Sequence, residues 1–286
     1  DEATTEALVQ TVRGCPLPTI VTLRATWEGG RCGLDDDQRA KLFTAAAEAG
    51  AAWIDCELLA YERSPALRAV LDRICRRADE EETAALLAGG MPDPRATPVG
   101  RPGPLLILSN HDFGGKPADL SDRIARLAAA DSAALLKIAF HAGSVRDAAD
   151  ALVLMAEFRG RFGKPLVALA MGEFGQISRL LAGKFKAPLT FAALSAGAQS
   201  APGQPTVQTL RELYRFTEQR PGCTVYGVLD RPVGHSISPP VHNAGFAEAG
   251  HDGVYVQLPI TPAYEEFSTT VDALRACPGM HLRGLS

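Results

Sequence analysis

The sequence lacks the features that mark membrane-spanning and nucleic-acid-binding proteins. No apolar stretch approaches the roughly 20 residues that a membrane helix needs. The formal net charge is −4, whereas a nucleic-acid-binding domain usually presents a basic face. The first residues, DEATTEALVQ, are acidic and do not have the layout of a signal peptide. We therefore expect neither a membrane nor a nucleic acid as a partner.

Cysteine pairs and ligand-binding signatures are also scarce. The six cysteines form no CxxC pair, and they are scattered at positions 15, 32, 56, 75, 223 and 277. This spacing predicts reduced thiols in a cytoplasmic protein rather than a disulfide framework. The chain has no GxGxxG, and GGKP at 114–117 lacks the spacing of a phosphate-binding loop. No group of His, Cys, Asp and Glu has a metal-ligand spacing, so no metal site is predicted.

The chain does contain a repeated alternation of apolar runs and helical patterns. Six runs are predicted to be strands: 18–24, 53–58, 104–110, 135–139, 165–171 and 189–193. These runs are continuously apolar rather than alternating, which is typical of parallel strands buried on both faces. Helical patterns cover 37–49, 118–130, 145–159 and 205–219. The first opens at an Asp cluster and should stop at Gly50, and the third should be capped by Ser144, with Gly160 beyond its end. The alternation predicts a parallel α/β architecture, either a barrel or a doubly wound sheet.

Two segments depart from this rhythm. Residues 63–103 form an insertion, helical and charged up to residue 90 and then rich in Pro and Gly, which predicts an exposed loop. Near residue 220 the sequence RPGC breaks the pattern, which restarts with a strand at 224–230, a helix after Ser238 and a strand at 253–259. We therefore predict two domains, residues 1–219 and 223–286.

Polar residues that close the strands are candidates for a catalytic site, because the chemistry of a parallel barrel gathers at the C-terminal strand ends. Lys137 lies in the apolar run ALLKIAF. Burial disfavours the ammonium and favours the neutral amine, the nucleophile for a Schiff base with a ketone. A lysine held in a salt bridge at the rim is the alternative. His111 is a natural proton carrier, with a structural histidine as its alternative.

Five further residues suit substrate binding or orientation. Glu28 is placed to orient His111, unless it is only a turn carboxylate beside two glycines. Arg179 suits a substrate carboxylate, which a guanidinium binds in a bidentate manner, although a helix-surface arginine is the alternative. Arg24 closes the first run. Ser200 and Gln204 follow the last one.

Several motifs, in this order, resemble type I 3-dehydroquinate dehydratase. They are TLRATWEGG (22–30), IDCEL (54–58), SNHDFGGKP (109–117), LLKIA (135–139), MGEFGQISR (171–179), TFAAL (190–194) and SAPGQ (200–204). The resemblance implies a TIM-type (β/α)8 barrel that dehydrates 3-dehydroquinate to 3-dehydroshikimate without a metal or dissociable cofactor. Lys137 would form the imine, and His111, held by Glu28, would move the protons. Arg24, Arg179, Ser200 and Gln204 would bind the carboxylate and hydroxyls.

The segment VGHSISPPVHNAGF (233–246) is similar to the start of shikimate dehydrogenase. The resemblance implies that Ser236 and Ser238 bind the carboxylate of shikimate or 3-dehydroshikimate. It also implies a longer parent chain that catalyses two reactions of the shikimate pathway, the dehydration of 3-dehydroquinate and the reduction of 3-dehydroshikimate. The dehydrogenase part of that chain would use NADP. The NADP-binding domain has no counterpart in this sequence.

The count of strands departs from the family. Six barrel strands are predicted where the family has eight, so we expect a barrel that lacks its first two strands, followed by a partial α/β substrate-binding domain. Open sheet edges favour wrong pairing, and we expect weak or no turnover from this chain alone. Two other functions stay open: another Schiff-base barrel enzyme such as a class I aldolase, and a regulatory homologue that binds metabolites without chemistry. The family resemblance also allows a homodimer.

Overall fold

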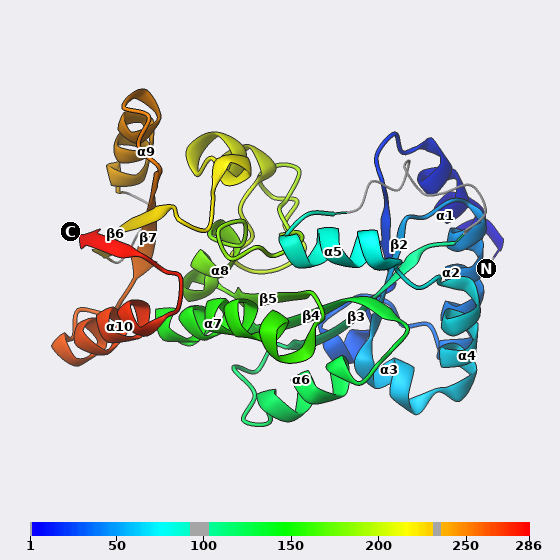
Figure 1. The fold of residues 1–286 in the computed structure, drawn as a ribbon. Coiled ribbons are helices and arrows are strands. Elements are labelled where there is room, and N and C mark those ends of the chain that lie inside the picture. The colour runs from blue at the N-terminus through cyan, green and yellow to red at the C-terminus, as the bar shows by residue number, and fades with distance from the viewer. Residues whose placement is uncertain (1, 92–102, 231–235) are drawn as a thin grey trace. The chain divides into compact units, whose positions relative to one another are not determined.

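The computed structural model describes residues 2–91, 103–230 and 236–286 (Figure 1). Its helices are α1 (Glu2–Gly14), α2 (Asp36–Glu48), α3 (Leu58–Arg63), α4 (Pro65–Ile74), α5 (Glu80–Ala88), α6 (Leu120–Ala128), α7 (Val145–Phe162), α8 (Ile177–Leu180), α9 (Ser238–Glu248) and α10 (Tyr264–Ala276). Its strands are β1 (Ile20–Thr22), β2 (Trp53–Glu57), β3 (Leu105–Asp112), β4 (Ala133–His141), β5 (Leu166–Met171), β6 (Thr224–Asp230), β7 (Gly253–Pro259) and β8 (Leu282–Leu285). Short helical turns are η1 (Thr26–Glu28), η3 (Glu173–Gly175), η4 (Thr209–Leu213) and η5 (Phe216–Glu218).

Five strands form one sheet in the order β1-β2-β3-β4-β5. β1 pairs with β2 and β2 with β3 in parallel, with Ile54 opposite Leu106 and Glu57 opposite Ser109. Every residue of β2 and of β5 is buried. This explains why the sequence shows continuous apolar runs there, since both faces of each strand are covered. The predicted parallel α/β architecture is confirmed.

The predicted sixth strand, 189–193, is wrong. Within the described residues this segment forms only an isolated parallel bridge, between Ala193 and Thr206. Pro188 stands before it and has no N–H to donate to a ladder. Ala193 N donates to Pro205 O (2.8 Å), and Val207 N donates to Ala193 O (2.9 Å). The apolar composition of the segment therefore predicted neither a strand nor complete burial, since only Ala193 of the five residues is buried.

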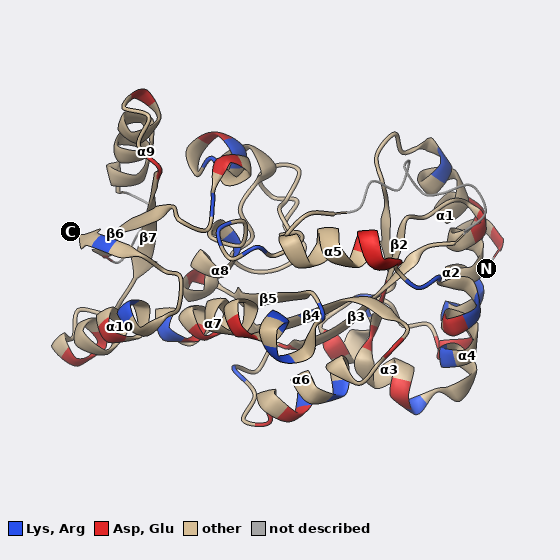
Figure 2. Cartoon of the chain, viewed as in Figure 1, with Lys and Arg blue, Asp and Glu red and all other residues tan. Residues whose placement is uncertain are grey.

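The chain divides into two compact units. The first comprises Asp1–Leu86, Met91–Phe113 and Asp119–Ile138, and the second comprises Leu87–Gly90, Gly114–Ala118 and Ala139–Ser286. The division falls inside β4. Acidic and basic residues are interspersed on α6 in the first unit and on α7 in the second (Figure 2).

Local sequence signals account for several of the helix ends. α2 begins with a capping box, in which Gln38 N donates to Asp35 Oδ1 (2.8 Å) and Asp35 N donates to Gln38 Oε1 (3.1 Å). It ends before Gly50, whose φ of +95° suits glycine, as predicted. Ser64 Oγ caps α4 by accepting from Leu67 N (3.2 Å). The predicted helical part of the insertion is confirmed by α4 and α5, whereas residues 92–102 of its predicted loop lie outside the described residues.

Two predicted helices need correction. The helix after Ser144 has the expected cap, a capping box with Asp147, but it continues through Gly160 to Phe162. Its end is Gly163, which has φ +63°. The predicted helix 205–219 is replaced by a π-helical turn, η4, and a 3-10 turn, η5. Arg215 separates them with φ +45°, a left-handed conformation that an α-helix cannot continue through.

The C-terminal segment of the second unit has its own sheet, in the order β7-β6-β8. The pairs β6–β7 and β6–β8 are both parallel. Asn243 of α9 fixes the helix to β7, because its amide donates to Tyr255 O (2.9 Å) and its carbonyl accepts from Tyr255 N (2.8 Å). The predicted strands 224–230 and 253–259 and the helix after Ser238 are confirmed.

Candidate active site

Glu28 and His111 form a close pair in the first unit. Glu28 ends η1, and His111 is the second-last residue of β3. Glu28 Oε2 accepts from the His111 backbone N–H (3.1 Å) and lies 3.0 Å from His111 Nδ1. One carboxylate oxygen therefore holds both the backbone and the ring of the histidine. A base whose ring is fixed through Nδ1 keeps Nε2 as its reactive nitrogen.

A close approach between backbone and ring fixes η1 against the end of β3. Gly29 follows Glu28 and has φ +73°. The Phe113 ring lies so close that a Cβ on Gly29 would be 2.2 Å from it. Only glycine permits both the left-handed conformation and this contact. The EGG and HDF segments thus position Glu28 and His111 together.

Lys137 lies within β4 and pairs with an acid that the sequence analysis did not select. Lys137 is only 7% exposed, and its Nζ donates to Asp55 Oδ2 at 3.1 Å. Asp55 is fully buried in β2. The sequence contained a pattern that could have identified Asp55 as a site residue. Asp55 and Glu57 are two residues apart in the apolar strand WIDCE, so their side chains point to the same face of the sheet.

Arg24 connects this ion pair with the other carboxylates. Its Nη2 donates to Asp55 Oδ1 (2.7 Å), and its Nη1 lies 3.2 Å from Glu57 Oε1 and 3.6 Å from Glu28 Oε2. Nη1 also donates to Ser109 Oγ (2.9 Å), which in turn donates to Asp55 Oδ1 (2.6 Å). Arg24, Glu28, His111 and Lys137, all selected from the sequence, therefore belong to one cluster of hydrogen bonds and ion pairs.

The cluster shifts the pKa values of its carboxyl groups in opposite directions. Burial raises the pKa of Glu28 to about 8, with Arg24 opposing the shift. Burial also acts to raise the pKa of Asp55, but the positive charges of Lys137 and Arg24 outweigh it and hold that pKa well below its usual range. Asp55 is therefore a permanent carboxylate, whereas Glu28 can hold a proton near neutral pH.

Arg179 is a buried cation in the second unit. It lies in α8 and is 2% exposed, and its Nε has no hydrogen-bond partner among the described residues. Burial lowers the pKa of Arg179 to about 10. A guanidinium removed from water gains from any anion that reaches it. Arg179 is thus not the helix-surface arginine of the alternative interpretation.

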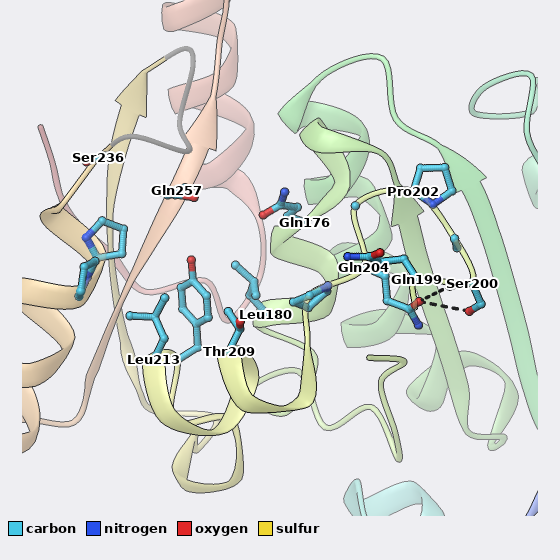
Figure 3. A pocket seen from close by; sticks show the side chains of 16 residues that line it. Gln176, Leu180, Gln199, Ser200, Pro202, Gln204, Thr209, Leu213, Ser236 and Gln257 are labelled. Carbon is cyan, nitrogen blue, oxygen red and sulfur yellow. Dashed lines mark hydrogen bonds between the residues drawn. The ribbon is translucent and has the colours of Figure 1, made fainter. Parts of the chain in front are cut away.

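Ser200 and Gln204 form a small hydrogen-bonded loop in the second unit. Ser200 N (2.8 Å) and Ser200 Oγ (3.2 Å) both donate to Gln204 Oε1. The two residues line a pocket of about 790 Å³, together with polar side chains that include Gln176, Thr209, Ser236 and Gln257. Figure 3 shows Ser200 and Gln204 at one side of this pocket and Ser236 at the other. The pocket offers amides and hydroxyls rather than charges.

Ser236 lies two residues before Ser238, which is the first residue of α9. Ser238 N, at the first turn of the helix, donates to Ser236 Oγ at 3.3 Å. Residues 231–235, which begin the motif that drew attention to these serines, lie outside the described residues. Only Ser236 of the two lines the pocket.

The described residues contain neither a metal-binding cluster nor a membrane-spanning helix. No group of three or more His, Cys, Asp or Glu side chains in the described ranges could hold a metal ion. Within those same ranges, none of the helices is both long enough and apolar enough to span a membrane. All six cysteines are free thiols.

Comparison with known proteins decides the family. The type I 3-dehydroquinase family model matches residues 1–77 and 101–221. The chain belongs to this family. The family model of the shikimate dehydrogenase substrate binding domain matches residues 228–286. The motifs that carry the resemblance in the sequence lie within these matched ranges.

Curated relatives include both single and bifunctional proteins. The chain is 34% identical over 256 residues to the chloroplastic bifunctional 3-dehydroquinate dehydratase/shikimate dehydrogenase of Arabidopsis thaliana, covering 88% of this chain and 37% of the relative. It is 31% identical over 205 residues to the 3-dehydroquinate dehydratase of Methanococcus maripaludis (strain C6), covering 71% of this chain and 78% of the relative. The chain therefore spans little more than a third of the Arabidopsis relative.

Solved structures show the same fold. A type I 3-dehydroquinate dehydratase from Clostridium difficile matches with a TM-score of 0.57 and 23% identity, covering 76% of each chain. The dehydroquinate dehydratase and shikimate dehydrogenase of S. pombe AroM matches with a TM-score of 0.54 and 22% identity, covering 95% of this chain and 45% of that one. These matches support the predicted barrel-type α/β fold followed by the start of a dehydrogenase substrate-binding domain.

Proposed function

We propose that this chain carries the dehydratase site of a shikimate-pathway enzyme, which converts 3-dehydroquinate to 3-dehydroshikimate through a Schiff base on Lys137. The observation that carries the proposal is the buried Lys137 amine in one cluster with the Glu28–His111 pair. An imine is an electron sink, and it makes the neighbouring carbon acidic enough for a histidine to deprotonate.

Asp55 suits the first step. The Asp55 carboxylate holds the Lys137 side chain in place and stabilises its ammonium before substrate binds. Imine formation needs the neutral amine, so Lys137 gives up one proton to solvent water before its nitrogen attacks the ketone carbon. The ketone oxygen becomes the hydroxyl of a carbinolamine, and it takes a proton back from solvent as it leaves. Loss of water from the carbinolamine then leaves the protonated imine. Asp55 remains beside this new cation as its counterion.

His111 suits the proton transfers. It removes the proton from C2, next to the imine carbon, and the electron pair moves into the enamine. The same imidazolium then gives its proton to the departing hydroxyl, which leaves as water. Glu28 stabilises the charged ring through Nδ1. Hydrolysis of the product imine returns Lys137 as the amine.

Arg179 is our candidate for the substrate carboxylate. The support is its burial and the unpartnered Nε. Arg24 contributes by holding the carboxylates in the first unit, while Ser200 and Gln204 offer hydrogen bonds to hydroxyl groups. The reaction as drawn needs no metal and no dissociable cofactor.

The second part of the proposal concerns the C-terminal segment. We place a second domain at residues 223–286, after the dehydratase domain 1–219, with Ser236 and Ser238 as ligands for the carboxylate of shikimate or 3-dehydroshikimate. NADPH reduction would belong to a longer protein, and no residue described here suits the dinucleotide. A cytoplasmic location and a homodimer stay predictions.

A single-turnover assay tests the dehydration. The chain, in excess over 3-dehydroquinate, should release 3-dehydroshikimate, detected by the ultraviolet absorbance of its conjugated double bond. His111→Asn and Lys137→Met should each remove this product, whereas the exposed His242→Asn should not. Product formation that survives Lys137→Met, or a wild-type chain that binds substrate and forms neither product nor a reducible adduct on Lys137, would overturn the proposal.

A further inference from the structure

A fully buried arginine pairs with Glu57, a neighbour of Arg24, and has no part in the chemistry proposed above. Arg39 belongs to α2, is 0% exposed and is the largest fully buried side chain of the molecule's described part. Its Nε has no hydrogen-bond partner among the described residues. Arginine is almost never fully buried unless it is paired, so the position of Arg39 depends on its partner.

That partner is Glu57, at the end of β2. Arg39 Nη2 donates to Glu57 Oε2, and Arg39 Nη1 also lies 3.3 Å from Asp36 Oδ1. The other oxygen of Glu57 accepts from Ala25 N (2.9 Å) and faces Arg24 Nη1 (3.2 Å). Glu57 thus stands between two arginines, and it is as completely buried as Asp55.

From Arg39 the charges alternate in sign as far as Lys137. Arg39 faces Glu57, Glu57 faces Arg24, Arg24 faces Asp55, and Asp55 faces Lys137. Glu28 is the third carboxylate near Arg24. Three buried carboxyl groups therefore lie around Arg24, and one of them, Asp55, also pairs with Lys137. Arg39 supplies the further cation that balances Glu57.

We propose that Arg39 is a positioning residue for imine formation at Lys137: it neutralises Glu57 and so leaves Arg24 to hold Asp55 and Glu28 in place. This inference rests on the proposed function for the identity of the carbonyl substrate. Without Arg39, Glu57 competes for Arg24, Asp55 loses its second cation, and Asp55 then binds the Lys137 ammonium more strongly. The amine becomes less available to a carbonyl.

Packing alone does not account for an arginine at this position. The neighbouring buried positions of α2 are Ala40, Leu42, Phe43 and Ala46, all apolar. A buried ion pair is often no more stabilising than apolar residues of the same volume, because both charges lose their hydration. The charge of Arg39, rather than its bulk, is therefore the property to test.

The test compares Arg39→Met, which keeps most of the volume, with Arg39→Lys, which keeps the charge. Arg63→Met is the matched control, since Arg63 also pairs with Asp36 but its side chain is 44% exposed. The first measurement is the rate of adduct formation on Lys137 with saturating 3-dehydroquinate, quenched with borohydride over time. Circular dichroism establishes that each variant is folded at the assay temperature, and the dissociation constant for substrate is measured separately.

A second measurement does not depend on the substrate. Formaldehyde condenses with a lysine amine to an imine with loss of water, and cyanoborohydride delivers hydride to give the methylamine. Mass spectrometry compares methylation of Lys137 with that of the exposed Lys186 in the same chain. This ratio reports the availability of the Lys137 amine in every variant.

We expect Arg39→Met to slow both reactions of Lys137 by about ten- to a hundredfold, the cost of misplacing a reacting group by roughly 1 Å. Substrate affinity should change little, Arg39→Lys should recover most of the rate, and Arg63→Met should match the wild type. Equal rates for Arg39→Met and wild type, or no recovery in a folded Arg39→Lys chain, would overturn the inference. A wild-type chain that is methylated at Lys137 but never trapped with 3-dehydroquinate would sink the proposed function and not the role of Arg39.

Discussion

Lys137 and Asp55 form a buried ion pair, with Nζ 3.1 Å from Oδ2, and Asp55 is fully shielded from solvent. The pair joins β4 to β2 and connects the amine with Arg24 and Ser109. The salt-bridged lysine that the sequence left open as an alternative and the Schiff-base lysine are therefore compatible. The carboxylate that holds the ammonium at rest is also the counterion that a protonated imine needs.

Asp55→Asn should destabilise the folded chain by about 3–5 kcal/mol, because it leaves two buried cations without their shared carboxylate. Urea unfolding gives the free energy. Asp150→Asn removes a carboxylate from an exposed pair with Lys116, and it should cost less than about 1 kcal/mol. An equal decrease in the free energy of unfolding in the two variants would show that burial does not determine the strength of the Lys137–Asp55 pair.

Glu28→Gln should stabilise the chain more at pH 8.5 than at pH 5.5. Burial raises the pKa of Glu28 from its usual 4.5 to about 8, so between these values the folded chain holds a proton that the unfolded chain has released. The wild type therefore loses stability as pH rises through this window, and the glutamine variant does not. Thermal unfolding at the two pH values should show a difference of several degrees. The exposed Glu248→Gln should give none.

Arg179→Met should raise the stability of the unliganded chain and weaken substrate binding. A guanidinium without a buried counterion costs solvation free energy, which methionine does not. Losing a charge-assisted hydrogen bond to the substrate carboxylate should lower the affinity for 3-dehydroquinate by about ten- to a hundredfold. Calorimetry and thermal unfolding measure the two effects. If the substitution destabilises the chain and leaves affinity unchanged, Arg179 is a structural residue.

Gly29→Ala should destabilise the chain more than Gly50→Ala. Both glycines have positive φ, so both substitutions introduce backbone strain. Only at Gly29 does a Cβ collide with a ring, that of Phe113, while Gly50 faces open space. The difference should be about 1–3 kcal/mol. A second substitution, Phe113→Leu, should recover part of it, and failure to do so would show that the contact is not the cause.

Much of the fold followed from local patterns. Continuous apolar runs identified the five strands of the main sheet, and capping residues such as Asp35 and Ser144 fixed where helices begin. The run 189–193 was wrongly predicted as a strand because apolar composition does not by itself provide a neighbouring strand, and only Ala193 of the run is buried. The end of α7 was wrongly predicted at Gly160, because a glycine is tolerated inside a helix. The helix ends at Gly163, which has a left-handed conformation.

The candidate site was only partly predictable. Lys137, His111 and Glu28 were visible because they end or interrupt apolar runs. Asp55 was overlooked although it shares one face of its strand with Glu57. Arg39 was not visible, since it looks like a member of a charged helix until its partner is known. Arg39 lies in α2 and Glu57 at the end of β2, so their pairing joins two elements that are separated in the sequence. No local pattern predicts such a contact.

The most direct test of the account is to locate the covalent adduct. The chain is incubated with 3-dehydroquinate, reduced with borohydride and digested, and the modified peptide is sequenced by mass spectrometry. The account predicts one reduced adduct, on Lys137, which is lost in Lys137→Met and retained in His111→Asn although that variant releases no product. An adduct on another lysine, or its persistence in Lys137→Met, would contradict the central claim.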